Sequence, residues 1–146
     1  MLKDVKQGVG VKIVEPVNLY GCELGDRVFV GPFVEIQRGA VIGADSRVQS
    51  HCFICDLVTI GERCFIGHGV MFTNDLFSQG GPARGDRTLY RETAIGNDVS
   101  LGSNATILPV KIADGCVVGA GAVVTKDLIV KGVYAGNPAR LIRKLP

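Results

Sequence analysis

The 146-residue chain contains no tryptophan, only two histidines and no excess of charge of either sign. Its formal net charge is +2, so charge gives no reason to expect a nucleic-acid partner or an acidic tail. No apolar run approaches the roughly 18 residues that a membrane span needs. The amino terminus also lacks the basic-then-apolar order of a signal peptide. These absences predict a soluble, cytoplasmic protein with neither a membrane nor a nucleic-acid partner.

Glycine, in contrast, is abundant, with 20 residues, and 47% of the chain is hydrophobic. A composition rich in glycine, valine and isoleucine favours β structure with many tight turns. The length provides one core and little more. We therefore expect a single domain over residues 1–146.

A six-residue repeat runs through most of the chain. Each block opens on an aliphatic or aromatic residue, which we call the opener: Leu24, Val30, Ile36, Ile42, Val48, Ile54, Ile60, Ile66, Phe72, then Ile95, Leu101, Ile107, then Ile112, Val118 and Val124. An amphipathic helix would instead repeat at three and four residues. Four residues after the first openers comes a small or β-branched residue: Val28, Val34, Ala40, Ser46, Cys52, Val58, Cys64 and Val70. The block between Ile107 and Ile112 is one residue short, which predicts a tightened corner or bulge near Pro109.

Such a short, fixed period is typical of a solenoid, in which each coil buries its inner face against its neighbours. The pattern resembles the hexapeptide repeat of left-handed parallel β-helix proteins, where three units close one triangular coil. The resemblance implies an all-β, left-handed parallel β-helix. The handedness comes from the resemblance, because the usual crossover is right-handed. Fifteen openers predict about five coils.

The Cys-x-x-Cys motif in "HCFIC" raises the question of a zinc site, because the chain has three further cysteines. Cys52, Cys64 and Cys116 all fall on the small inward position of their blocks. Cys22 does too, if the register extends back to Asn18. We therefore expect buried thiols and no metal. The odd count of five also fits a reducing compartment.

The repeat is interrupted in "NDLFSQGGPARGDRTLYRET", which predicts an inserted loop over about residues 74–94. Insertions in repeat proteins form loops on one face, often the binding face. We favour a functional loop because it follows "GHGVMFTND" directly, and a solvated loop without function is the alternative. The last residues, "VYAGNPARLIRKLP", predict a turn and a C-terminal cap over about residues 130–146. The segment "VKIVEPVNLYGC" is expected to form a first, irregular coil.

Two runs carry a functional resemblance. "VVGAGAVVTKDLIVKGVYAGNPARLIRK" resembles the carboxy-terminal signature of hexapeptide acyltransferases, which use acetyl-CoA or another acyl donor. "VQSHCFICDLVTIGERCFIGHGVMFTNDLF" is similar to nucleotide-sugar 3-amino N-acetyltransferases of the UDP-2-acetamido-3-amino-2,3-dideoxyglucuronate and dTDP-3-amino-3,6-dideoxyhexose types. These enzymes belong to bacterial surface-polysaccharide (O-antigen and lipopolysaccharide) biosynthesis. The resemblance implies acetyl-CoA as cosubstrate, a nucleotide-sugar substrate, and a homotrimer with active sites at subunit interfaces.

The expected catalytic residues are His68 and Asn74. They lie near different corners of one coil, more than about 10 Å apart at 3.3 Å per strand residue, so they meet only across an interface. Acetyl transfer needs an unprotonated amine and a stabilised oxyanion. We expect His68 to accept the amine proton, Asn74 to hold the oxyanion or the amine, and Asp75 to bind the amine. His51, 17 residues earlier, is the rival base. A catalyst that only positions the amine, with both histidines as ordinary corner residues, stays an alternative.

The remaining site residues follow from the resemblance. Pantetheine would pair with backbone groups of the later coils, and two basic residues would lie near the donor's phosphates. The first set is Gly102, Ala105, Ala120 and Ala122; the second is Lys126 and Arg140. The nucleotide-sugar would bind nearer the amino-terminal coils, with Arg84, Arg87 and Arg91 as candidate phosphate partners. A merely solubilising tail is the alternative for Arg140.

Three other functions are alternatives to this one. An O-acetyltransferase would make a histidine base obligatory, because a hydroxyl is the weaker nucleophile. A γ-class carbonic anhydrase has a similar fold but needs three histidines on zinc, and this chain has two. A non-catalytic β-helix scaffold is disfavoured by the specific "GHGVMFTND" and "AGNPAR" runs.

Overall fold

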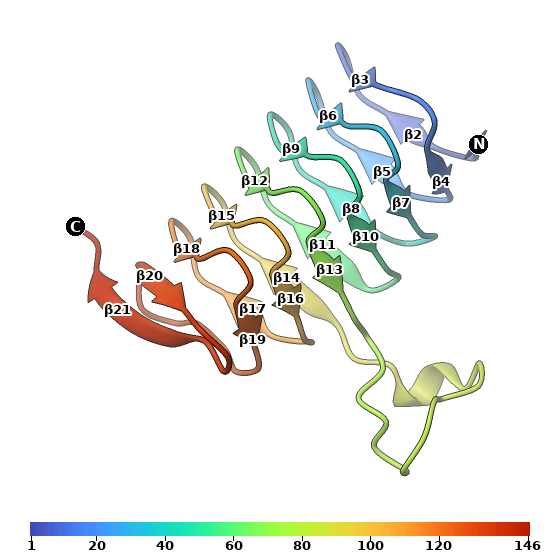
Figure 1. The fold of residues 1–146 in the computed structure, drawn as a ribbon. Helices are drawn as coiled ribbons and strands as arrows, with labels where there is room; N and C mark the ends of the chain where they lie inside the picture. Colours follow the sequence, from blue (N-terminus) through green and yellow to red (C-terminus); the bar gives the residue numbers. More distant parts are fainter.

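The computed structural model describes residues 1–146, in which twenty-one short β-strands and one 3-10 helix follow one another along the chain. Figure 1 shows the strands stacked in successive coils between the two termini, with the segment between β13 and β14 projecting outward. Apart from the last strand, β21, all strand pairs are parallel. The fold is the predicted left-handed parallel β-helix.

Three sheets form the faces of the solenoid, and each of the first six coils contributes one strand to each sheet. Sheet A contains β1 (Leu2–Lys3), β4 (Asn18–Tyr20), β7 (Glu35–Ile36), β10 (Phe53–Ile54), β13 (Met71–Phe72), β16 (Thr106–Ile107) and β19 (Val123–Val124). Sheet B contains β2 (Lys6–Gln7), β5 (Glu23–Leu24), β8 (Val41–Ile42), β11 (Val58–Ile60), β14 (Thr93–Ile95) and β17 (Lys111–Ile112). Sheet C contains β3 (Lys12–Ile13), β6 (Phe29–Val30), β9 (Arg47–Val48), β12 (Phe65–Ile66), β15 (Ser100–Leu101), β18 (Val117–Val118), β20 (Gly132–Ala135) and β21 (Arg140–Lys144).

The solenoid has seven coils, where the repeat predicted about five. The irregular first coil was predicted over "VKIVEPVNLYGC", but the structure has it over β1, β2 and β3, where exposed residues such as Lys6 and Gln7 give no hydrophobic period. These strands join the sheets through backbone pairing, and Lys6 also forms an ion pair with Glu23. Of the seventh coil, the repeat detected only the opener Val124 in β19, because the next inward residue, Leu128, follows after four residues and forms a single bridge with Ile112. The hydrophobic period therefore detects the coils whose inward residues keep a spacing of six, and the solenoid extends beyond them at both ends.

The predicted core is confirmed in detail. All fifteen openers are buried, none more than 4% exposed, and so are the eight small residues that follow them. The register extends back to Leu19, which is fully buried, and not to Asn18, which faces outward from sheet A. The reason is that the block from Leu19 to Leu24 is one residue short.

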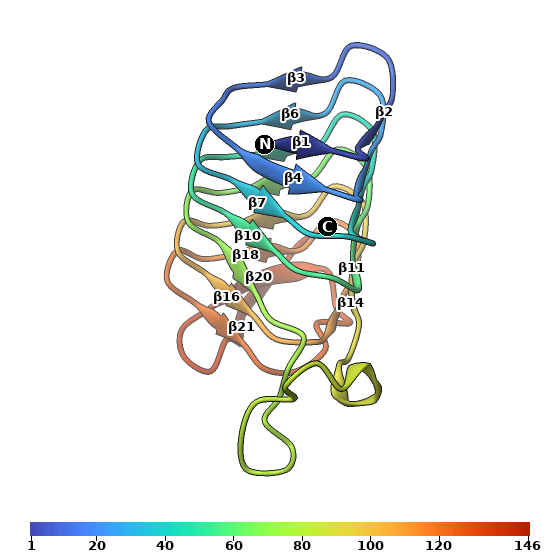
Figure 2. The same cartoon turned by 90° about the vertical axis from the view of Figure 1, so that its right-hand side faces the viewer.

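Length variation is confined to one corner, the A–B corner, where the chain passes from sheet A to sheet B. There the spacing of inward residues is five from Leu19 to Leu24 and from Ile107 to Ile112, and 23 from Phe72 to Ile95. Between Leu24 and Val124, the other two corners, B–C and C–A, always keep a spacing of six. Pro109 occupies a bend at this corner, as the short block predicted. Figure 2 shows the inserted loop leaving the solenoid at this edge.

The predicted inward cysteines are confirmed as buried free thiols, and Cys55 is buried as well. Three of them also donate hydrogen bonds. The Sγ of Cys52 lies 2.9 Å from the carbonyl oxygen of Gly67, that of Cys64 lies 3.0 Å from the carbonyl oxygen of Gly96, and that of Cys116 lies 3.5 Å from the carbonyl oxygen of Val130. Burial raises the pKa of Cys52 to about 11. The inward thiols thus act as weak donors to corner carbonyls as well as filling the core.

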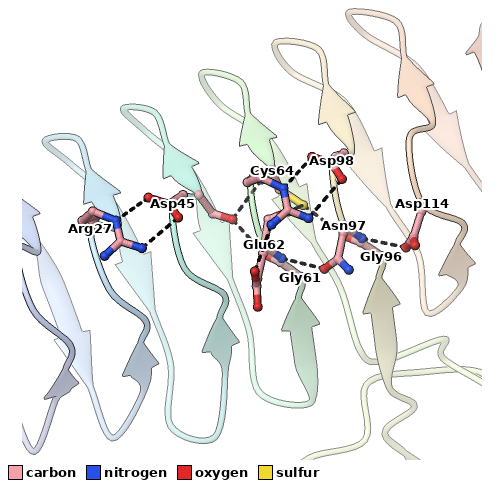
Figure 3. A network of polar contacts seen from close by, with 11 residues as sticks. Arg27, Asp45, Gly61, Glu62, Cys64, Gly96, Asn97, Asp98 and Asp114 are labelled. Atoms are coloured by element: carbon pink, nitrogen blue, oxygen red, sulfur yellow. Dashed lines mark hydrogen bonds and ion pairs between the residues drawn. The ribbon is translucent and has the colours of Figure 1, made fainter.

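The B–C corner carries an alternating ladder of charges (Figure 3). Arg27 donates to Asp45 through Nε and Nη2, at 2.7 and 3.0 Å, and Arg63 donates to Asp98 through Nε and Nη2, at 2.9 and 3.2 Å. Hydrogen bonding to each guanidinium holds the pKa of Asp45 and of Asp98 below the usual range. Because one coil separates the members of each pair, the bridges fasten adjacent coils to one another.

The C-terminal strand closes the last coil. β21 pairs antiparallel with β20 at the end of sheet C, with Tyr134 opposite Leu141 and Ala135 opposite Arg140. The hydroxyl of Tyr134 donates to the carbonyl of Val130 at 2.6 Å.

The structure contains no helix with the length and apolar character of a membrane span.

Candidate functional site

The C–A corner, where the chain passes from sheet C to sheet A, places His68 directly beside a residue of the previous coil. The Oγ of Ser50 lies 2.9 Å from Nδ1 of His68. His68 is exposed, and its Nε2 makes no hydrogen bond within the chain. The arrangement fixes the plane of an imidazole whose second nitrogen is free for proton transfer. Ser50 was not predicted, and its only signal in the sequence is the separation of 18 residues, or one full coil.

The two predicted bases share the C–A corner but have different surroundings. His51 is exposed and has a left-handed backbone, with φ of 66°. Its ring packs against Phe33 of the coil before, with ring centroids 4.9 Å apart and a tilt of 32°. His68, by contrast, has a hydroxyl partner and no aromatic neighbour. The geometry therefore favours His68 over His51 as the group that exchanges a proton.

Exposed apolar side chains flank this corner on both faces. Phe65, outward on sheet C, is 43% exposed, and Met71, outward on sheet A, is 41% exposed. Phe33, at the corner itself, is 57% exposed. Large apolar groups gathered around polar ones mark a contact surface more often than a solvated one. The histidine corner thus has the character of an interface.

Asn74 lies at the A–B corner, where the inserted loop begins, so β13 separates it from His68 as expected. Its Nδ2 donates to the carbonyl oxygen of Asp56, one coil earlier, at 3.0 Å. Asn74 is half-buried, and its Oδ1 accepts no hydrogen bond within the chain. One amide proton and the oxygen remain available for a ligand.

The carboxylate of Asp75 accepts hydrogen bonds within the loop. Its Oδ1 accepts from the backbone N–H of Phe77 at 3.0 Å, and its Oδ2 accepts from that of Ala83 at 2.7 Å. Its backbone also forms an antiparallel bridge with Tyr90 across the base of the loop. Both carboxylate oxygens therefore have structural partners, and Asp75 shapes the loop whether or not it contacts a ligand.

The three loop arginines lie in different environments. Arg84 is exposed and forms no ion pair, and it lines a surface hollow with Gln79, Asp86 and neighbouring loop residues. Arg91 donates from Nη1 to the carbonyls of Thr88 and Tyr90, at the end of the 3-10 helix η1 (Arg87–Leu89). Arg87 forms an ion pair with Asp56 of the solenoid. Arg84 and Arg91 thus keep donors for an anion, whereas Arg87 is committed to the protein itself.

The predicted pantetheine positions fall in two groups. Gly102, Ala105 and Ala122 already use their backbone groups in the ladder. The N–H of Gly102 donates to the carbonyl of Val118, and the carbonyls of Ala105 and Ala122 accept from Met71 and Thr106 of the preceding coils. Ala105 and Ala122 are also fully buried. Ala120 is exposed, and neither its N–H nor its carbonyl is bonded within the chain.

The unbonded N–H of Ala120 belongs to a column along the C–A corner. The residues directly below it, Ser103 and His68, also have backbone N–H groups that donate to no acceptor in the chain. Ser103 was not predicted. Its position one coil above His68 makes it a natural extension of the histidine site. A linear ligand with spaced carbonyls would match such a column.

The two basic residues assigned to the donor's phosphates lie at the C-terminal end of the solenoid. Lys126 occupies the last A–B corner, and Arg140 begins β21. Both are exposed, and neither forms an ion pair. They are free to attract an anion.

Comparison with protein families assigns the chain. The description "Hexapeptide repeat of succinyl-transferase" matches residues 57–71 and 92–126, and "Bacterial transferase hexapeptide (six repeats)" matches residues 21–56. Together they cover the solenoid from residue 21 to residue 126 and omit only the segment that contains the loop. This chain belongs to the hexapeptide-repeat family of bacterial transferases. The family repeat and the buried openers describe the same feature.

Known hexapeptide-repeat proteins resemble this chain over most of its length. The bifunctional protein GlmU of Clavibacter sepedonicus is 37% identical over 109 residues, which are 74% of this chain and 20% of GlmU. The GDP-perosamine N-acetyltransferase of Caulobacter crescentus, solved with CoA and GDP-perosamine, is 21% identical to this chain and superposes with a TM-score of 0.69. The match covers 96% of this chain and 58% of that chain. A hexapeptide-repeat acetyltransferase of Vibrio cholerae, solved with acetyl-CoA, is 24% identical and superposes with a TM-score of 0.65. This match covers 95% of this chain and 70% of that chain. This chain thus spans about one fifth of the curated relative's length, and the solved structures share its fold.

Proposed function

We propose that this hexapeptide-repeat protein is an acetyl-CoA-dependent N-acetyltransferase that acts on the 3-amino group of a nucleotide-linked sugar in bacterial surface-polysaccharide biosynthesis. The observation that carries the proposal is the exposed His68, oriented by Ser50 at Nδ1 and free at Nε2. A neutral imidazole in this arrangement accepts the proton of an attacking amine and returns it to the departing thiolate. The similarity to enzymes solved with CoA, acetyl-CoA and GDP-perosamine supports the same reaction class.

The donor would lie along the C–A corner above His68. The unbonded N–H groups of Ser103 and Ala120 are suitable partners for the carbonyls of pantetheine. Lys126 and Arg140 supply positive charge at the same end of the solenoid for the phosphates of CoA. Because Ala105 and Ala122 are buried, they would pack behind the C–A corner rather than bind the donor.

The acceptor would lie below His68, toward the amino-terminal coils. A surface groove there is lined by Pro16, Asn18, Phe33 and Glu35, among others. The carboxylate of Glu35 accepts from the amides of Asn18 and Gln37, each at 3.1 Å, which holds it rigid. An exposed aromatic ring beside a fixed carboxylate suits a ligand with a flat ring and hydroxyl groups.

A homotrimer would complete the site. His68 and Asn74 lie at opposite ends of β13, so one chain cannot bring both to the same substrate atom. Cyclic symmetry would set the C–A corner of one subunit against the A–B corner of its neighbour. The exposed Phe33, Phe65 and Met71 would then be covered. Asn74, Asp75, Arg84 and Arg91 would reach the acceptor from the neighbouring subunit.

The test is release of free thiol from acetyl-CoA with UDP-, dTDP- and GDP-linked amino sugars and their hydroxyl counterparts. Wild type should turn over only with amino sugars. His68→Ala should lower kcat by about 100-fold or more if His68 is the base. His51→Ala should keep most of the activity, because its ring packs on Phe33. Absence of thiol release with every sugar would reject the nucleotide-sugar acceptor.

An O-acetyltransferase is the second candidate, because the Ser50–His68 pair is the arrangement that a hydroxyl acceptor would require. Turnover with the hydroxyl sugars and not with the amino sugars would select it. Analytical ultracentrifugation of the wild-type protein would separately test the trimer, since a monomer at assay concentration contradicts a shared site.

A further inference from the structure

One ion pair joins the inserted loop to the solenoid. Arg87, the first residue of η1, pairs through Nη2 with Oδ2 of Asp56, at the A–B corner of the coil before the loop. The other five ion pairs all lie within the solenoid. The side chain of Asp56 is only 15% exposed, whereas that of Arg87 is 66% exposed. The loop therefore reaches down to a carboxylate that the solenoid holds in place.

The corner is shaped around Asp56. Its Oδ1 accepts from the backbone N–H of Leu57 at 2.7 Å, which fixes the carboxylate and turns Oδ2 toward the loop. Gly39, in the coil below, has φ of +88°, and a Cβ there would lie 2.5 Å from Oδ1. Glycine at this position leaves the space that the carboxylate occupies.

Asp56 is also bonded to Asn74. The Nδ2 of Asn74 donates to the carbonyl of Asp56 at 3.0 Å, and the carbonyl of Asn74 accepts from the N–H of Arg91 at 2.9 Å. Asn74 is the first residue of the loop, and Arg91 lies near its end. One solenoid residue thus contacts the start of the loop through its backbone and the middle through its side chain.

The loop itself is held together by internal hydrogen bonds. Asp75 binds the N–H groups of Phe77 and Ala83, and Asp86 accepts from the N–H and hydroxyl of Thr88. A body that is braced internally and attached at a narrow base needs a second attachment to hold its orientation. The Asp56–Arg87 pair is that attachment.

We propose that Asp56 is a positioning residue, which acts through Arg87 to hold the loop against the A–B corner and so orients Asn74, Arg84 and Arg91 toward the acceptor. The inference rests on the proposed function for its kinetic consequence only. Asp56 itself contacts no reacting group. The attachment of the loop is a property of the protein without substrate.

Hydrogen–deuterium exchange tests the attachment first. Asp56→Asn keeps the shape of the side chain and the acceptor for Leu57, but removes the charge that binds Arg87. Exchange over residues 74–92 should rise roughly threefold to tenfold, as expected for loss of a partly buried ion pair. Exchange over residues 47–66 should stay unchanged. Arg87→Gln should have the same effect, and the double variant should add nothing to either single change.

Kinetics test the positioning. In Asp56→Asn the KM for the acceptor should rise roughly fivefold while the KM for acetyl-CoA stays constant, and Asp56→Glu should recover part of the loss. The matched control is Glu92→Gln, which removes an exposed loop carboxylate that has no hydrogen-bond or ion-pair partner.

The outcomes separate the two ideas. Unchanged loop exchange in Asp56→Asn would overturn the proposal, whatever the activity. Faster loop exchange with unchanged acceptor KM would overturn the positioning role. If wild type transfers no acetyl group to any sugar, the proposed function fails, and the exchange result alone still decides whether Asp56 holds the loop.

Discussion

The hydroxyl oxygen of Ser50 lies 2.9 Å from Nδ1 of His68, although 18 residues separate them, because one coil of the solenoid returns the chain to the same corner. The contact is made by the period of the fold rather than by a local turn. It fixes one nitrogen of the imidazole and leaves the other exposed. The same geometry would place any residue of this column directly above or below the histidine.

Removal of this hydroxyl should impair catalysis without unfolding the protein. Ser50→Ala should lower kcat by about 10-fold, because the imidazole loses the partner that fixes its orientation. The KM for acetyl-CoA should hardly change, and Ser50→Thr should restore part of kcat. Steady-state kinetics across the pH range would check this. Equal kcat values for Ser50→Ala and wild type would mean that the contact does not serve catalysis.

The core contains one buried hydroxyl that has no partner, Oγ1 of Thr93, in a residue that is 1% exposed. Thr93→Val should raise the free energy of unfolding by about 1 kcal/mol, since it removes an unsatisfied polar atom at nearly constant shape. Ser46 occupies the same inward position, but donates to Gly61 and accepts from Cys64. Ser46→Ala should therefore destabilise by about 1–2 kcal/mol. Thermal or denaturant unfolding would show the two opposite signs, and changes of the same sign would contradict the assignment.

Gly43 shows why glycine so often follows an opener. A Cβ at this position would lie 2.5 Å from the carbonyl carbon and oxygen of Gly61 in the next coil. Gly43→Ala should thus destabilise by about 1–3 kcal/mol, because backbone atoms of stacked coils have to separate. Gly81→Ala is the control, since nothing lies within 4 Å of its added Cβ. A loss of stability in both variants would point to backbone flexibility instead of close approach.

The charge ladder should make the solenoid acid-sensitive. The guanidinium groups lower the pKa of Asp45 and Asp98 in the folded state below the unfolded value of about 3.9. The folded protein therefore binds fewer protons in this range. The stabilisation is complete above the unfolded pKa and is lost as pH falls through the folded pKa.

The measurement is the melting temperature from pH 6 down to pH 2.5. Wild type should lose stability more steeply below about pH 4 than the Asp45→Asn, Asp98→Asn double variant. Added salt should reduce the difference, since the four side chains of both pairs are solvent-exposed at 41–58%. Parallel acid curves for the two proteins would show that the ladder does not contribute.

The hydrophobic period was enough to predict most of the fold. The six-residue period assigns each opener to the inner face, and all fifteen openers are buried. The same period identified the inward cysteines. Errors arose where the period gave no information. Leu19 was missed in favour of Asn18 because a five-residue corner shifts the frame by one. The first coil was placed too far along the chain because Lys6 and Gln7 carry no apolar signal.

The candidate site was less accessible from the sequence. His68 and Asn74 were proposed through a resemblance, whereas the contacts with their partners, Ser50 and Asp56, become visible only in the structure. The Asp56–Arg87 pair joins a coil to a segment that has no period, so no spacing could predict it. The occupied backbone groups of Ala105 and Ala122 follow from strand pairing, which the sequence does not reveal residue by residue.

Because variable spacing is confined to the A–B corner, the three edges of the solenoid tolerate insertions to different degrees. Two edges of the prism have a fixed length and transmit the stacking from coil to coil. The third edge accepts spacings of four to 23 between inward positions, and the chain still returns to register at Ile95 and Leu128. Loops of new length and sequence can therefore be inserted at this edge and can change the acceptor that is bound, while the stacked core that stabilises the fold stays the same.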